Sequence, residues 1–408
     1  MMKQLLITLA ACLLTSQAWA ITSKNLAVEQ EALYKRLSPT DQMKPVMALR
    51  LADLLFDAST EVQKGVEFTA KQAKEMETFR LKAISLYENA LSGFNGQFKQ
   101  PGGNDALRIQ FQLARLYMDQ GYGDKADRLW EILANQNAEP RIRKESALRR
   151  AEKLEVSNAA SELAGAKKYY DIAFKLCGTK DLCSYIQYRR GWINHRLGAS
   201  DLGLDDLLKS LESTEAGSVA DILKDIILFL SHSNRTPEKA VALIEELGAK
   251  YQKNDLVEQL SLSFFTADRR EHYRYTVEHL NKKSPRIDRL VSLIEQDYSE
   301  KNWKSLREHF AAIRKLGPLS FNTPEKKVET QKVVYRLIVQ WDGELHRNTE
   351  FKEFFDLGVE FYTRIYFNGP EIDKVIDGWL AVESNDELKL TRIQEWIAQH
   401  QAIPARVL

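Results

Sequence analysis

The sequence is poor in the residues that interrupt helices. Ten prolines and nineteen glycines are spread over 408 residues, whereas Asp, Glu, Lys and Arg make up 28% of them. Because proline and glycine are the main helix breakers, this composition favours long amphipathic helices joined by short turns. We therefore predict an all-α fold with no strand-rich domain.

Cysteine is also scarce. Of the three cysteines, Cys12 lies near the N-terminus, and Cys177 and Cys183 flank a short loop between two predicted helices. A pair facing each other across such a loop is typical of a disulfide in an oxidising compartment, contributing about 2 kcal/mol. The alternatives are a redox-active pair or half of a metal site, but both favour a two-residue spacing.

The chain lacks an excess of charge of either sign. Its net charge is +1, and the loss of the first twenty residues would remove Lys3 and leave 57 basic and 57 acidic residues. A neutral chain has no overall electrostatic drive toward nucleic acid or anionic lipid. We expect no nucleic-acid partner.

Motifs of catalysis are missing as well. The sequence has no glycine-rich phosphate loop, no nucleophile elbow, no metal-binding histidine pair on one helix turn and no Asp-rich calcium loop. We therefore predict no enzymatic activity, no cofactor and no metal.

The first twenty residues have the pattern of a secretory signal peptide. Lys3 precedes an apolar run from Leu5 to Leu14, which is followed by Ala18, Trp19 and Ala20. This predicts cleavage after Ala20 and an exported protein. The run is shorter than the about 20 apolar residues that cross a bilayer, and no second run is longer, so we predict no transmembrane span. Alternatively, residues 9–12 match a lipoprotein signal in which Cys12 carries the lipid.

Residues 104–138 have the pattern of one complete helical hairpin. It is carried by Leu113, Ala114, Tyr117, Gly121, Ala126 and Trp130. Small residues at positions 114 and 126 allow two antiparallel helices to cross closely, and the two aromatic residues fill the space beside the crossing. Such a hairpin cannot bury its own apolar face, so neighbours of similar design must stack on it.

Similar hairpins follow on both sides. Their marker residues are Leu51, Ala52 and Leu55 with Ala83, Tyr87 and Ala90; Ala151 and Leu154 with Ala166, Tyr170 and Ala173; Gly191 and Gly198 with Gly203 and Leu207; and then Ala240, Ile244 and Leu247. After residue 250 the helical periodicity persists in 255–283 and 287–316, but clean pairs of small residues do not. A break from Gly317 to Pro324 precedes the C-terminal helices.

Residues 27 to about 250 resemble an array of tetratricopeptide-type repeats. The resemblance implies a helical-hairpin solenoid that winds as a right-handed superhelix. We expect a signal peptide at 1–20, repeats at 21–316 that are clearest at 40–250, and a C-terminal helical cap or degenerate repeats at 317–408. Departures from the family pattern are a long insert between Ser59 and Phe79, an excess of three residues before Ala166, and the faded repeats after 250.

With the signal peptide, the chain is similar to periplasmic repeat proteins, and residues 33–58 are similar to large repeat proteins of gliding and predatory bacteria. This implies a scaffold that binds protein or peptide partners in the cell envelope, as part of a motility, secretion or wall-associated machine. Alternatives are a peptidoglycan-associated or lytic-transglycosylase-like superhelical protein, a lipoprotein adaptor of the outer membrane, and a small-ligand binder.

Two basic clusters lie on predicted first helices of hairpins. The candidate partner-binding residues are Arg143, Arg149, Arg150, Arg189, Arg190 and Arg196. First helices line the concave side of such a superhelix, so these guanidinium groups are placed to meet a carboxylate-bearing ligand. Solvation, and pairing with Glu145 and Glu152 on the same helix, is the alternative.

Overall fold

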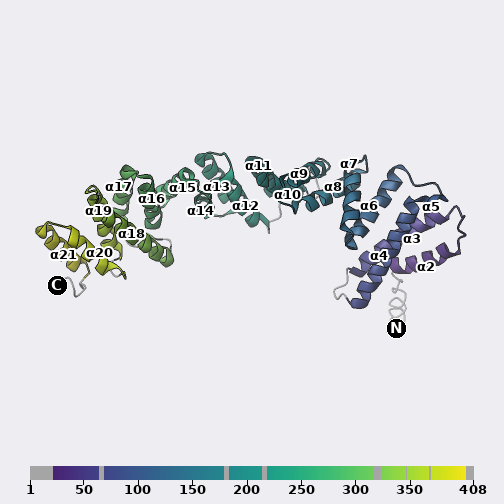
Figure 1. The fold of residues 1–408 in the computed structure, drawn as a ribbon, viewed down its shortest axis with the longest axis horizontal. Coiled ribbons are helices and arrows are strands. Elements are labelled where there is room, and N and C mark those ends of the chain that lie inside the picture. The colour runs from purple at the N-terminus through teal and green to yellow at the C-terminus, as the bar shows by residue number, and fades with distance from the viewer. Residues whose placement is uncertain are drawn as a thin grey trace, which may run out of the picture. The chain divides into compact units, whose positions relative to one another are not determined.

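The computed structural model describes residues 22–63, 69–178, 183–213, 218–316, 321, 323–345, 347–366 and 369–400. All regular secondary structure in these ranges is helical, and most consecutive helices within a unit pack on one another (Figure 1). The predicted all-α helical-hairpin solenoid is therefore confirmed. The predicted signal peptide and Cys12 lie outside the described residues.

The chain divides into two compact units, residues 1–229 and 230–408. Unit 1 contains α2 (Ser23–Arg36), α3 (Lys44–Gln63), α4 (Ala70–Leu91), α5 (Gly93–Gly96), α6 (Gly103–Asp119), α7 (Gly123–Asn135), α8 (Pro140–Glu155), α9 (Ala160–Lys175), α10 (Cys183–Arg196), α11 (Ser200–Glu212) and most of α12 (Val219–His232). The short α5 is a single turn with a positive φ at each residue.

Unit 2 continues with the same kind of element. It contains α13 (Pro237–Tyr251), α14 (Leu256–Thr266), α15 (Arg270–Lys283), α16 (Ile287–Glu300), α17 (Trp303–Arg314), α18 (Pro324–Leu345), α19 (Phe351–Tyr366), α20 (Ile372–Val382) and α21 (Asp386–His400). We call α6, α8, α10, α14, α16 and α18 the first helices of their hairpins, and α7, α9, α11, α15, α17 and α19 the second helices.

In the hairpin of α6 and α7 the residues at the helix crossing are buried. Ala114 and Ala126 are fully buried, and Leu113, Tyr117 and Trp130 are at most 6% exposed. The Trp130 ring meets Phe111 edge to face, with ring centroids 5.6 Å apart. Gly121 is exposed and has a φ of 77°, which places it at the turn between the helices.

The other residues expected to pack the repeats are buried too. Ala83, Tyr87, Ala166 and Tyr170 are at most 1% exposed. Gly191 of α10 and Gly203 of α11 mark the tightest crossing, because a methyl group on Gly203 would lie 2.6 Å from the Gly191 carbonyl oxygen. Only glycine allows two helix backbones to approach this closely.

The hairpin turn recurs beyond residue 250, where the sequence pattern fades. The recurring hydrogen bonds run from Tyr122 N to Tyr117 O, Ala199 N to Asn194 O, Arg269 N to Phe264 O and Asn302 N to Asp297 O, at 2.8–2.9 Å. The residue before each donor has a positive φ: Gly121, Gly198, Asp268 and Lys301. The α14–α15 and α16–α17 hairpins therefore keep the turn geometry of the earlier repeats although their turn glycines are replaced.

The residues at the crossings of these later hairpins differ from those of α6 and α7. Ser261 and Tyr273, and Ile294 and Leu306, stand where α6 and α7 have Ala114 and Ala126. Ile294 and Leu306 are at most 1% exposed, so the close approach is replaced by packing of large apolar side chains.

The C-terminal helices share one apolar core with α16 and α17. This core contains the fully buried Trp341 of α18 and Tyr362 of α19 together with Leu306 and Phe310 of α17. Gly358 allows α19 to approach α18, since a methyl group there would lie 2.9 Å from the Trp341 ring. Helices α18, α19 and α20 are thus packed on the last repeats as a continuation of the stack.

The structure also describes the long insert and the cysteine pair noted in the sequence. The insert between Ser59 and Phe79 lengthens α3 and α4, and the Thr69 and Gln72 side chains form a capping box at the start of α4. Cys177 and Cys183 form a disulfide, with Cα atoms 5.8 Å apart, that joins the end of α9 to the start of α10. Residues 179–182 between them are outside the described part of the chain.

Candidate partner-binding surface

Arg190, on α10, is one of the six predicted partner-binding arginines. Its side chain is 15% exposed and pairs with Asp206 of α11 and with Asp171 of α9, the latter at 3.4 Å. Its guanidinium carbon lies 4.3 Å from the centroid of the Phe174 ring. Arg190 therefore cross-links three consecutive helices.

The other arginines also make contacts within the chain. Arg196 donates to the carbonyl oxygens of Glu155 and Ser157, both at 2.7 Å. Arg189 pairs with Glu155, Arg150 pairs with Asp127, Arg143 donates to the Ala134 carbonyl oxygen and Arg149 pairs with Glu152. Their role in binding a partner stays a prediction. Five of the six arginines contact a residue on another helix or loop, which analysis of a single helix does not reveal.

Two aromatic side chains of α10 form hydrogen bonds with α12 in unit 1. Tyr188 and the Trp192 indole N–H both donate to Asp225 Oδ2, at 2.8 and 3.3 Å. Burial, and then the hydrogen bond to Asp225, raise the pKa of Tyr188 to about 12. Burial raises the pKa of Asp225 despite the hydrogen bonds it accepts. These groups satisfy one another and hold the two helices together.

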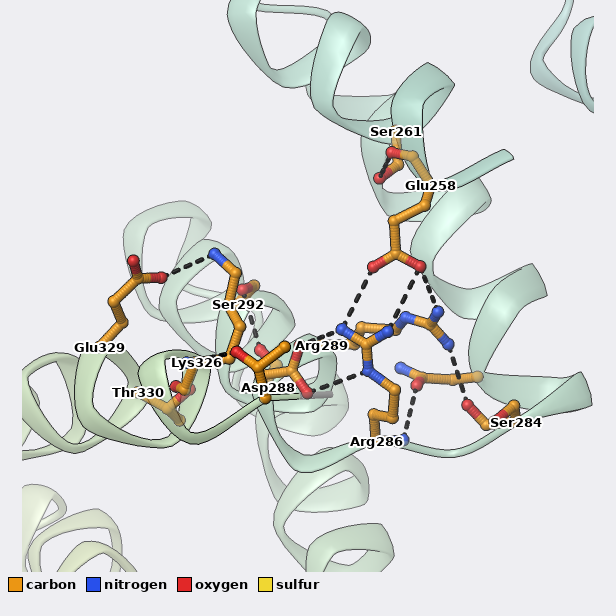
Figure 2. A network of polar contacts seen from close by, with 12 residues as sticks. Glu258, Ser261, Ser284, Arg286, Asp288, Arg289, Ser292, Lys326, Glu329 and Thr330 are labelled. Carbon is orange, nitrogen blue, oxygen red and sulfur yellow. Dashed lines mark hydrogen bonds and ion pairs between the residues drawn. The ribbon is translucent and has the colours of Figure 1, made fainter. Parts of the chain in front are cut away.

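Unit 2 has a cavity of about 290 Å³ walled by α14, α15, α16 and α18 (Figure 2). Leu262, Val277, Leu280, Val291 and Val333 provide apolar lining. Three cations and three carboxylates also line it: Arg286, Arg289, Lys326, Glu258, Asp288 and Glu329. With the charges balanced, the cavity suits a neutral apolar group.

A network of ion pairs fixes one wall of this cavity. Arg286 pairs with Asp288 and reaches Glu258 of α14 at 3.2 Å (Figure 2). Glu258 also accepts from Arg289, which donates in turn to the Ser284 carbonyl oxygen at 2.9 Å. Because Arg286 and Arg289 are 13% and 10% exposed, these pairs are largely shielded from solvent and rigidly connect α14 to the start of α16.

The opposite wall, from α18, is more exposed. Lys326 and Glu329 pair at 2.6 Å, with side chains 49% and 63% exposed. Exposed pairs of this kind contribute at most about 1 kcal/mol and exchange readily with solvent. This wall can therefore rearrange around a bound group, whereas the arginine wall cannot.

A second cavity of about 450 Å³ adjoins the first and shares Leu262, Tyr273 and Ser292 with it. Its lining includes Phe265, and the Phe265 and Tyr273 rings lie 5.3 Å apart. Leu262 and Phe265 are 58% and 67% exposed, so α14 presents two large apolar side chains to solvent. We call Leu262, Phe265 and the two cavities the α14 surface.

The sequence analysis did not single out the α14 surface. Leu262 and Phe265 belong to the segment from Leu260 to Phe265, which has four apolar residues and two serines and in which Leu260 and Phe264 are fully buried. The sequence signal that could have indicated this surface is that the helix has more apolar residues than a single buried face needs.

The buried carboxylate of Asp297 in unit 2 has structural partners. Asp297 is fully buried and accepts from Arg274 at 2.6 Å and from His309 Nδ1 at 2.7 Å, which connects α15, α16 and α17. Among the described residues there is no group of three or more His, Cys, Asp or Glu that could hold a metal. A search of the same residues finds no helix both long and apolar enough to cross a membrane.

Comparison with known proteins gives no match to a family model or to a curated protein. One solved structure that it finds is a circular tandem repeat protein with novel repeat topology and enhanced subunit contact surfaces. It is 14% identical, the match covers 92% of this chain and 87% of that chain, and the TM-score is 0.18. Because that TM-score is too low to support an argument, the fold assignment rests on the helices and turns described above.

Proposed function

We propose that this chain is an exported scaffold protein that binds other proteins through the first-helix face of its hairpins. The observation that carries the proposal is the α14 surface, where Leu262 and Phe265 are exposed beside two cavities. Exposed apolar side chains next to well-formed cavities mark protein interaction sites. Stacked hairpins supply the rigid support that such a site needs.

The proposal includes a place in the cell envelope. The signal-peptide pattern at residues 1–20 and the resemblance to periplasmic repeat proteins support export to the periplasm and membership of a motility, secretion or wall-associated complex. The mass of the intact purified chain tests the export step. Loss of residues 1–20 is expected, and a lipid on Cys12 would show instead that the chain is a lipoprotein.

Chemical cross-linking in intact cells tests the binding function. The chain is purified from the envelope fraction after cross-linking, and the attached proteins are identified by mass spectrometry. Three forms are compared: the wild type, the double variant Leu262→Glu with Phe265→Glu, and the control Leu202→Glu. Leu202 is 57% exposed on α11, so the control places a charge at matched exposure on a second helix.

We expect a defined set of envelope proteins with the wild type and the control, and loss of at least one of them with the double variant. The reason is that a carboxylate on α14 cannot be desolvated against an apolar partner. Recovery of a solitary chain that holds glycan fragments would contradict the scaffold function and favour binding to the cell wall.

A further inference from the structure

The two cavities of the α14 surface follow one face of α16. Arg289 lines the cavity of about 290 Å³, Gln296 and Ser299 line the cavity of about 450 Å³, and Ser292 lines both. Ser292, Gln296 and Ser299 come three, seven and ten residues after Arg289, a spacing that puts all four on one side of a helix. The cavities therefore lie one after the other along α16 and form a single elongated site.

Gln296 presents an unused hydrogen-bond acceptor at one end of this site. It is 8% exposed, and its Nε2 donates to the Arg270 carbonyl oxygen at 3.2 Å and to Glu300 at 2.7 Å. These two acceptors fix which way the amide group points. No described residue donates to the buried Oε1 of Gln296. The neighbouring Ser299 donates its hydroxyl to the Gln296 carbonyl oxygen at 2.8 Å, so the Ser299 hydroxyl oxygen can still accept.

Arg289 presents an unused donor at the other end of the site. Its side chain is 10% exposed, and two of its nitrogens donate to Glu258 and to the Ser284 carbonyl oxygen (Figure 2). The third nitrogen, Nε, is buried and has no acceptor among the described residues. Because a buried polar group without a partner is unfavourable, a ligand that supplies the missing acceptor and donor gains free energy at both ends.

The spacing of these two groups fits an extended polypeptide. Seven residues along α16 separate Arg289 from Gln296, which is about 10.5 Å along the helix axis. Three residues of extended chain cover about 10 Å, and their backbone N–H and C=O groups are free to bind a partner. A helical segment uses those groups internally and would leave both ends of the site unpaired.

We propose that the α14 surface binds an extended, uncharged segment of a partner protein. One backbone carbonyl oxygen of the segment accepts from Arg289 Nε, and a backbone N–H about three residues away donates to Gln296 Oε1. Alternate aliphatic side chains of the segment, which point to the same side, enter the two cavities and contact Leu262 and Phe265. The inference rests on the proposed scaffold function and names the conformation and chemistry of the partner segment.

The segment can enter when exposed side chains at the cavities move. Lys326 and Glu329 line the first cavity as an exposed pair. Arg270 and Asp268 pair at the second cavity, with side chains 60% and 83% exposed. Exposed pairs of this kind separate at little cost. Each pair is neutral overall, which agrees with an uncharged segment.

A binding experiment with synthetic peptides tests the proposal. The probe is a fluorescein-labelled peptide in which Leu alternates with Thr, and its binding to the full chain is measured by fluorescence anisotropy. Three reference peptides have Ser in place of Leu, methyl groups on the central backbone nitrogens, or the same composition with Leu at helical spacing. We expect the probe to bind at least about tenfold more tightly than each reference. Its affinity should change little with NaCl, because the segment is uncharged.

A matched pair of variants tests the backbone hydrogen bond. Gln296→Met removes the acceptor, and the control Gln259→Met makes the same change on α14, where the Gln259 side chain donates to Asp255 outside the cavities. We expect Gln296→Met to bind the probe and its N-methylated form about equally, whereas the wild type and the control still prefer the probe. A general loss of packing would weaken both peptides alike and keep the preference.

Surface truncations test the apolar contacts without disturbing the core. Leu262→Ala with Phe265→Ala should weaken probe binding about tenfold, and the control Leu202→Ala should weaken it by less than about twofold. All three residues are at least 57% exposed, so the variants are expected to fold.

The inference is overturned if the probe does not bind the wild type, if the N-methylated peptide binds as tightly, or if the peptide with helical spacing binds more tightly. The scaffold function is judged separately by the cross-linking comparison in cells. If the partner set there depends on Leu262 and Phe265 but the peptide results fail, the scaffold function stands and only the extended segment is rejected.

Discussion

Charged residues on these helices divide into two groups by burial. Arg190 and Asp206 are 15% and 6% exposed and make several hydrogen bonds across helices. Arg141, in the first turn of α8, is exposed. Shielded pairs contribute to stability only as long as both partners are present, whereas an exposed cation contributes little to stability and is available to a ligand.

Replacing Arg190 therefore tests stability. The change Arg190→Met leaves the buried Asp206 carboxylate without its main partner, so the free energy of unfolding in urea should fall by about 3 kcal/mol. Arg141→Met should change it by less than about 0.5 kcal/mol. Equal stability of the two variants would show that Arg190 is not a structural cross-link.

The glycine crossing makes a second prediction. Gly203→Ala puts a methyl group 2.6 Å from the Gly191 carbonyl oxygen and 2.9 Å from the Phe229 ring, so the unfolding free energy should fall by about 2 kcal/mol. Gly378 of α20 has no atom within 4 Å of the same methyl position. Gly378→Ala should therefore raise stability by about 0.5–1 kcal/mol, and a destabilisation as large as that of Gly203→Ala would contradict this account.

A buried carboxylate predicts acid sensitivity. Glu383 is 5% exposed, and the Lys352 ammonium at 2.9 Å, followed by the Asn385 backbone N–H, lowers the pKa of Glu383 below its ordinary value of 4.5. Because the folded chain holds this proton less tightly than the unfolded chain, the contribution is present above pH 4.5 and lost as the pH falls below it.

The variant Glu383→Gln removes this titration. Between pH 6 and pH 3, measured by urea unfolding at each pH, the variant should lose less stability than the wild type does. Parallel pH profiles for the two proteins would show that Glu383 does not titrate differently in the folded and unfolded chains.

At the level of helices and turns, the sequence predicts a hairpin where small residues mark the crossing. Ala114 and Ala126 do so for α6 and α7, and glycine does so for α10 and α11. Beyond residue 250 the same turn is made by Asp268 and Lys301, and the large apolar Ile294 and Leu306 pack the crossing of α16 and α17. The backbone conformation is preserved while the residue types that reveal it are not. The sequence therefore predicts helices of repeat-like length after residue 250, but not the residues that form their turns and crossings.

The turn residues can be tested by exchange. Lys301 has a φ of 58°, a conformation that costs a residue with a side chain about 1 kcal/mol relative to glycine. Lys301→Gly should therefore raise the unfolding free energy by about 1 kcal/mol. Gly121→Ala should lower the unfolding free energy by a similar amount, because the φ of residue 121 is 77°. The added methyl group would meet no atom within 4 Å, so this loss comes from the backbone conformation alone. A loss of stability in Lys301→Gly would contradict the proposed turn equivalence.

The candidate sites were less accessible to sequence reasoning than the fold. Positions of arginines can be read along a helix, but their partners Asp127, Glu155 and Asp206 come from other helices. Exposure of Leu262 and Phe265 is likewise decided by which face of α14 the neighbouring helices cover. Periodicity indicates that a helix has a buried face, and only the packed structure shows which apolar residues remain outside it.

For the whole molecule, the two units offer surfaces of different chemistry. The α14 surface in unit 2 combines exposed apolar side chains with balanced charges. The arginines on α8 and α10 of unit 1, in contrast, pair mostly with other helices of that unit. The α14 surface is therefore where we expect a partner to bind.

The most direct test of the scaffold function is site-specific photo-cross-linking in living cells. A photoreactive phenylalanine analogue replaces Phe265 of the α14 surface in one strain and Leu202 of α11 in another, at 67% and 57% exposure. We predict that the analogue at position 265 cross-links to one defined envelope protein and that the analogue at position 202 does not. Absence of a protein adduct at position 265, or the same adducts at both positions, would contradict the account.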